Sequence, residues 1–66
     1  MLRTVDFSTL IRELRESGVS QNSIARETGY TQANISQIAR GKIKDPAWPL
    51  GDYIIRRHAE VFRAAP

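Results

Sequence analysis

The fold is decided by residues 21–42, which read QNSIARETGYTQANISQIARGK. This stretch predicts two short helices, over residues 21–27 and 32–40. Ser20 and Thr31 are their expected N-caps, because a hydroxyl side chain can accept a hydrogen bond from the free amides of a first turn. The apolar positions that would face a core are Ile24, Ala25, Ile35, Ile38 and Ala39. Gly29 lies in the turn, where it can adopt a positive φ that costs other residues energy. Two helices joined by about four residues with one Gly form a helix-turn-helix arrangement.

One further helix is predicted on each side of this stretch. Before it, the apolar residues at positions 7, 10, 11 and 14 share one face of a helix that Asp6 or, alternatively, Thr4 would cap and Gly18 would close. After it, residues 41–49 (GKIKDPAWP) contain too much Gly, Pro and charge for regular structure. Pro49 then suits the first turn of a last helix over about residues 49–63. Its expected inner face carries Leu50, Ile54, Val61 and Phe62. The sequence therefore predicts an all-α fold, a small four-helix domain with a helix-turn-helix.

The composition limits the possible functions. The 66 residues suffice for one domain, residues 1–66, and they contain no Cys and one His, which excludes disulfides and Cys- or His-rich metal sites. No Ser has a His or Lys at the spacing of a nucleophile and its base, so we expect no enzyme. With so few Cys and His residues we also expect no metal, and we expect no cofactor. The net charge of +3 favours a polyanionic partner. No apolar run approaches the ~20 residues of a membrane span, and the first residues do not form a signal peptide. We therefore expect a cytoplasmic protein without membrane contact.

Residues 21–42 resemble the helix-turn-helix of lambdoid phage repressor and Cro proteins, an Xre-like family. That family characteristically has Gln, then Ile or Val followed by Ala, a turn Gly, a Gln at the start of the recognition helix, and then Ile and a Gly-Lys exit. Every one of those positions is matched here, over about a third of the chain. The resemblance implies a repressor-like fold and a sequence-specific transcription regulator. Such a protein binds double-stranded DNA at the nucleoid, usually as a homodimer on a palindromic operator.

The chain departs from the family after this motif. Longer repressor domains have more helix there, and some Cro proteins have strands, whereas the remaining length here admits one helix and a short tail. We expect no second domain that senses a ligand or cleaves itself, and so no small-molecule ligand. Regulation would then depend on concentration and operator occupancy. A Cro-like repressor of a phage or prophage is therefore favoured over a ligand-switched one.

The outer face of the expected recognition helix favours base reading. Its side chains are Gln32, Ala33, Asn34, Ser36 and Gln37, and none of them is an acid. Gln and Asn can bond adenine N6 and N7 together, and the Ala33 methyl can pack on a thymine methyl. Recognition helices of this motif enter the major groove with their N-terminal residues toward the bases. An acid-free polar face is otherwise an ordinary solvated surface, and it is the turn spacing and the basic exit that favour DNA.

Phosphate contacts are expected on both sides of that helix. Gln21 begins the preceding helix, whose free backbone amides can point at a phosphate. Arg40, Lys42 and Lys44 follow the recognition helix directly, with Asp45 beside Lys44 to neutralise part of its charge. In the resembled family the residues matching Gln21 and Arg40, and the loop matching Lys42 and Lys44, meet the sugar-phosphate backbone. Such contacts position the protein without reading sequence.

A homodimer is expected, because one helix-turn-helix contacts too few base pairs to select a site. We place its interface at Trp48, Tyr53 and Phe62, since aromatic residues are enriched in interface cores. The alternative is that Trp48 and Phe62 complete the small core of one subunit. A second alternative concerns function: the same fold can serve as a protein-interaction module, such as an antirepressor or an antitoxin.

Overall fold

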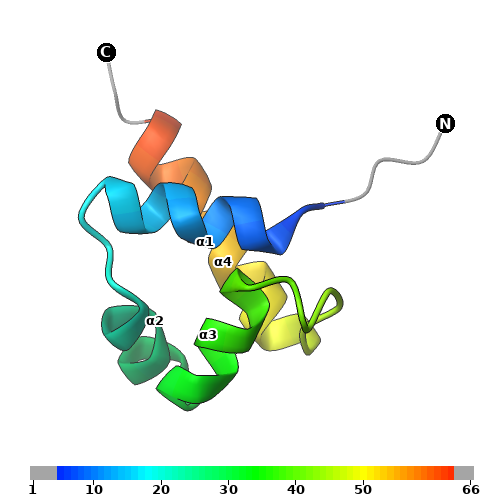
Figure 1. The fold of residues 1–66 in the computed structure, drawn as a ribbon. Helices are drawn as coiled ribbons and strands as arrows, with labels where there is room; N and C mark the ends of the chain where they lie inside the picture. The colour runs from blue at the N-terminus through cyan, green and yellow to red at the C-terminus, as the bar shows by residue number, and fades with distance from the viewer. Residues whose placement is uncertain (1–4, 64–66) are drawn as a thin grey trace, which may run out of the picture.

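The helices begin at the capping side chains that the sequence predicts. The computed structural model describes residues 5–63, which form the four helices α1 (Phe7–Glu16), α2 (Gln21–Thr28), α3 (Gln32–Ala39) and α4 (Trp48–Arg63), with no strand (Figure 1). Asp6, Ser20 and Thr31 accept hydrogen bonds from the amides three residues later, at 3.4, 3.1 and 3.1 Å. The all-α prediction is confirmed. The last helix begins one residue earlier than expected, and the two central helices end within one residue of the expected positions.

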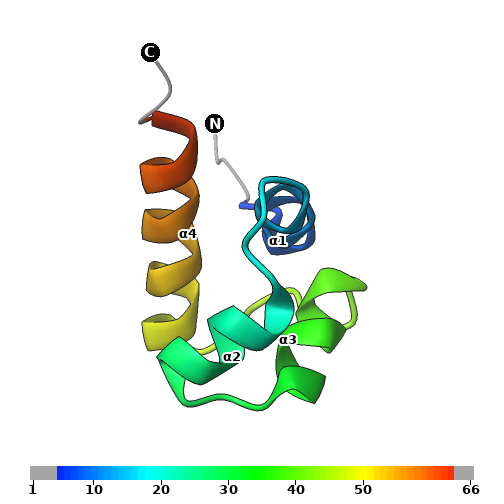
Figure 2. The ribbon, with the colours of Figure 1, turned by 90° about the vertical axis from the view of Figure 1, so that its left-hand side faces the viewer.

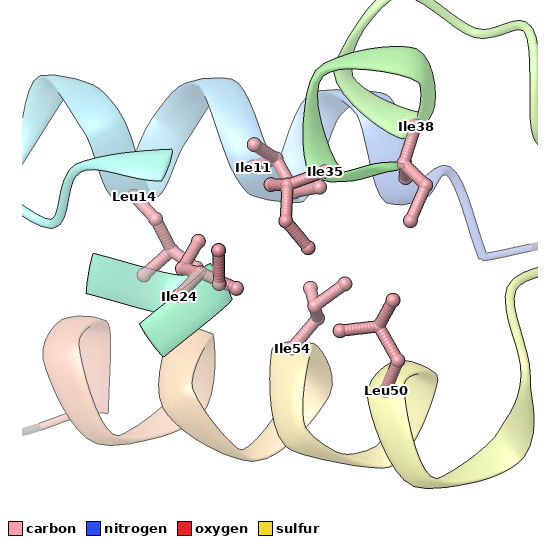
Figure 3. Packing of buried hydrophobic residues seen from close by; sticks show 8 residues of the cluster. Ile11, Leu14, Ile24, Ile35, Ile38, Leu50 and Ile54 are labelled. Carbon is pink, nitrogen blue, oxygen red and sulfur yellow. The ribbon is translucent and has the colours of Figure 1, made fainter. Parts of the chain in front are cut away.

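A single apolar core joins the four helices. Its buried members come from every helix: Ile11, Leu14, Ile24, Ala25, Ile35, Ile38, Leu50 and Ile54 (Figure 3). They are three or four residues apart in α1, α3 and α4 and adjacent in α2, so each helix turns one face inward. No polar or charged residue of the described range is buried. The core therefore fixes the rotation of each helix and, with it, the side chains that point outward.

The arrangement leaves α2 and α3 together at one end of the molecule. Figures 1 and 2 show α4 as the longest helix, with α1 lying across it and the α2–α3 pair near the first turns of α4. α1 packs on both α4 and α3, and α2 packs on both α3 and α4. The close approach of α1 to α4 depends on Gly51, because a Cβ there would lie 3.3 Å from the Phe7 ring. The outer faces of α2 and α3 are thus held on a frame made by α1 and α4.

Phe62 was expected on the inner face of the last helix, but it lies outside the core. Val61 packs against the core, whereas Phe62 is 46% exposed. Adjacent residues on a helix point in directions about 100° apart, and here Val61 has the inward direction and Phe62 the outward one. None of the helices in the described part of the chain combines the length and the hydropathy that crossing a bilayer requires.

Candidate nucleic-acid interface

The outer face of α3 carries the five side chains expected to read bases. Gln32, Ala33 and Gln37 are exposed, and Asn34 and Ser36 are half-buried at its flanks. On the opposite side of the helix, Ile35 and Ile38 are completely buried. Because these two isoleucines fix the rotation of α3, two amide side chains and one methyl group are held toward solvent.

Gln21 and Gln32 meet although eleven residues separate them. The amide nitrogen Nε2 of Gln32 donates to Oε1 of Gln21 at 3.3 Å. Gly29 makes this meeting possible, because its φ of 82° turns the chain from α2 into α3. The contact leaves Oε1 and one Nε2 hydrogen of Gln32 free for another partner. The first turns of α2 and α3 therefore form one polar surface.

The basic segment after α3 is fixed to the end of that helix. The amides of Lys42 and Ile43 both donate to the carbonyl oxygen of Gln37, at 2.9 and 3.3 Å. Arg40 is the C-cap of α3, and Arg40, Lys42 and Lys44 are all exposed. None of the three forms an ion pair within residues 5–63, and this includes Lys44 with Asp45. Three exposed cationic side chains thus lie at the C-terminal end of α3, and none of them is held in an ion pair by a carboxylate of residues 5–63.

Most of the acidic side chains are engaged on other surfaces. Asp52 pairs with Arg56 at 3.2 Å and Glu60 with Arg57 at 3.3 Å, all on α4. Glu13 of α1 lies 2.7 Å from His58 of α4 through its Oε1 atom. Asp6 caps α1, and hydrogen bonds from Ser8 and Thr9 hold the pKa of its carboxyl below the usual value. The outer face of α3 itself carries no carboxylate.

A second exposed feature is an apolar stripe on α4, formed by Trp48, Ile55 and Phe62. They are 73%, 38% and 46% exposed, and they account for three of the four exposed large hydrophobic residues in the described range. A spacing of seven residues places them on one side of the helix. The Phe62 ring also packs on the ring of His58, with 4.4 Å between centroids. Trp48 therefore does not complete the core, which was the alternative considered for it.

Tyr53 lies away from this apolar stripe. Its ring packs against the core, and its hydroxyl donates to Oε1 of Glu27 on α2. Burial raises the pKa of Tyr53 to about 12, and the hydrogen bond to Glu27 adds to this effect. Tyr53 thus joins α4 to α2 within one subunit, whereas the sequence analysis grouped it with Trp48 and Phe62.

Two residues of these surfaces, Ile55 and Arg15, were not predicted from the sequence. Ile55 belongs to the apolar stripe, and the seven-residue spacing of positions 48, 55 and 62 is a signal that could have found it. Arg15 lines a surface hollow with Ser20, Gln21, Asn22 and Gln32. No sequence pattern connects Arg15 to Gln32, because the two residues lie on different helices and line one hollow only in the folded chain.

Within residues 5–63, no group of three His, Asp or Glu side chains is arranged to hold a metal ion. Comparisons with models of protein families, with curated proteins and with solved structures found no match to this chain.

Proposed function

We propose that this chain is a sequence-specific regulator of transcription that binds double-stranded DNA, a Cro-like repressor that occupies a palindromic operator as a homodimer. In this proposal α2, the turn at Gly29 and α3 form a helix-turn-helix, and α3 is the recognition helix. The observation that carries it is the outer face of α3, which is acid-free, rich in amides and followed by three unpaired cations. Such a protein would act in the cytoplasm, at the nucleoid.

Base reading is assigned to the outer face of α3. Gln32 has one amide hydrogen engaged by Gln21 and retains an acceptor and a second donor. This is the pair of groups that bonds N6 and N7 of adenine in the major groove. Gln37 offers the same chemistry about one and a half turns further along the helix, and Ala33 can pack against a thymine methyl. Asn34 and Ser36, which are half-buried, would act at the flanks of the site.

Phosphate binding is assigned to side chains around that face. Arg40, Lys42 and Lys44 follow α3 and are exposed, and Gln21 lies at the start of α2, where free amides face outward. Contacts of this kind fix the position of a protein on the duplex and make its affinity depend on salt. They would set the depth and angle at which α3 enters the groove.

The apolar stripe on α4 is assigned to the homodimer. Trp48 is the most exposed of its members, and an aromatic side chain that loses such exposure on association supplies much of an interface's free energy. Two subunits related by a two-fold axis would present two recognition helices about 34 Å apart, one turn of DNA. Two half-sites supply the specificity that one subunit lacks.

A second candidate function is a protein-interaction module, such as an antirepressor or an antitoxin. The same apolar stripe favours it, since an exposed Trp48 beside Ile55 could equally bind a different protein. The two functions differ in what they need from α3. A protein-interaction module would require no base preference from Gln32 and Gln37.

Selection of bound duplexes from a random pool tests the proposal, with the molecular mass of the complexes measured on the same sample. Enrichment of a palindromic site by a protein of twice the subunit mass is the expected result. Stable binding of another protein together with equal retention of all duplexes would instead establish the protein-interaction module and reject the regulator.

The assignment of individual bases is tested by Gln32→Ala and Gln37→Ala. Each variant should lose discrimination at one position of the selected half-site, at a cost of about 1–3 kcal/mol for the matched sequence. Asn22→Ala removes an exposed amide from α2 and is the matched control, which should keep the base preference of the wild type. A loss of affinity that is equal for all sequences would contradict base reading by these two glutamines.

A further inference from the structure

Arg15 lies at the edge of the polar surface formed by the first turns of α2 and α3. Its side chain lines the same surface hollow as Gln21 and Gln32, the two residues whose amides are hydrogen bonded to each other. The other residues around the hollow are Ser20 and Asn22, so the lining contains one cation, no carboxylate and otherwise only neutral polar side chains. An anionic group is the chemistry that such a lining favours.

The guanidinium of Arg15 is not committed to a partner within residues 5–63. The ion pairs in this range use Arg56, Arg57 and His58 of α4, and none of them involves Arg15. Arg15 is exposed in the last turn of α1. All five of its donors are therefore available to a ligand from outside the subunit.

The position of Arg15 complements the cations at the other end of α3. At the C-terminal end of α3, Lys44 lines a second hollow together with Ser8 of α1 and Ile38 of α3. Ser8 lies in the first turn of α1 and Arg15 in its last turn, so each of the two hollows is lined by a different end of α1. Arg15 thus lines the hollow that contains Gln32, at the N-terminal end of α3, and Lys44 lies with Arg40 and Lys42 after its C-terminal end.

The length of α3 matches the width of the DNA major groove. Eight residues of helix span about 12 Å, which is close to the width of the major groove of B-DNA. Cations at both ends of such a helix can reach the phosphates of the two strands that border the groove. At the Gln32 end the proposed phosphate contact of Gln21 is uncharged, so without Arg15 only one border of the groove would have a charged anchor.

We propose that Arg15 binds a backbone phosphate of DNA at the Gln32 end of α3, opposite the phosphates held by Arg40, Lys42 and Lys44. This site rests on the proposed function and adds a charged anchor at the end where Gln21 was assigned an uncharged one, from a helix outside the helix-turn-helix. Arg15 also carries positive charge at the C-terminal end of α1, which favours helix stability whether or not DNA is bound. The two roles differ in the salt dependence of DNA binding, which a purely structural role would not change.

The test measures the slope of log K against log salt concentration on the selected operator for the wild type, Arg15→Ala, Arg15→Gln and Arg15→Lys. Loss of one phosphate contact should lower the magnitude of the slope by about 0.9 for each bound subunit. Arg15→Ala and Arg15→Gln should show this loss equally on matched and mismatched duplexes, and Arg15→Lys should keep most of the wild-type slope. Arg63→Ala is the matched control, because it removes an exposed Arg from the last turn of α4, at the opposite end of the molecule from α3 (Figure 2).

Each outcome has a distinct meaning. An unchanged slope in folded Arg15→Gln, with operator binding retained, would overturn the Arg15 site and leave the proposed function standing. A wild type that binds no duplex would overturn the proposed function, and the Arg15 site with it. Circular dichroism of every variant separates a lost contact from a lost fold, and Arg15→Gln keeps part of the side chain in place should Arg15→Ala disturb α1.

Discussion

Gly29 is the residue on which the relation between α2 and α3 depends. Its φ of 82° lies in the left-handed region, and its amide donates to the carbonyl oxygen of Ala25 at 2.9 Å to close α2. A Cβ at this position would meet no atom within 4 Å. The requirement for glycine is therefore conformational and not a matter of space. The backbone turn that it allows brings Gln32 beside Gln21.

Replacement of Gly29 tests this explanation. Gly29→Ala should lower the free energy of unfolding by about 1–2 kcal/mol, the cost of placing an L-residue in the left-handed region. Gly29→Asn should cost less, because Asn tolerates this conformation. Urea unfolding followed by circular dichroism measures both. Equal stability of the wild type and Gly29→Ala would show that the turn has relaxed to another conformation.

At the scale of elements, α2 is held against α4 by more than the apolar core. Tyr53 on α4 donates its hydroxyl hydrogen to Glu27 on α2, and its ring packs against the core. Burial and this hydrogen bond both favour the protonated phenol, which is why the pKa of Tyr53 rises from 10.0 to about 12. The folded state therefore binds a proton more tightly than the unfolded state does.

This contact predicts a specific loss of stability at high pH. Because the folded pKa of Tyr53 is the higher one, its contribution is fully present below pH 10 and is lost as the pH rises toward 12. We expect the wild type to lose more unfolding free energy between pH 9 and pH 12 than Tyr53→Phe does, as measured by urea unfolding. Tyr30→Phe changes the other tyrosine and should behave like the wild type. A decline in Tyr53→Phe equal to that of the wild type would contradict the contact with Glu27.

At the scale of the whole molecule, a small core is combined with the exposed apolar stripe of α4. A chain of 66 residues has an expected unfolding free energy of about 3–10 kcal/mol. The core consists of eight buried residues, while Trp48, Ile55 and Phe62 are left partly or largely in water. Association through this apolar stripe would add stability that one subunit does not have.

Two substitutions on α4 distinguish the core from the apolar stripe. Ile54→Ala should cost about 2–5 kcal/mol and unfold much of the protein, because Ile54 is completely buried. Trp48→Ala should keep the fold of the subunit, since 73% of Trp48 is exposed, but should weaken dimerisation by about 2 kcal/mol or more. Circular dichroism and sedimentation equilibrium measure the two effects. A Trp48→Ala protein that dimerises like the wild type would remove the apolar stripe from the interface.

The sequence by itself determined the helices and the inward faces of α1, α2 and α3. Caps such as Asp6 and Thr31 and apolar spacings of three and four act within a few residues of chain, so local chemistry is sufficient to place them. The exposure of Gln32 and Gln37 followed for the same reason, because burying Ile35 and Ile38 leaves the opposite face of a helix outside.

The tertiary structure alone decided which residues from different helices meet. It placed Arg15 and Gln32 around one surface hollow, brought the hydroxyl of Tyr53 to Glu27, and left Trp48 outside the core. It also determined that Val61 packs against the core while the neighbouring Phe62 is exposed. These outcomes depend on the angles at which the helices cross and on the volume that the core can hold. Both are properties of the packed molecule, so the spacing of residues within one segment does not determine them.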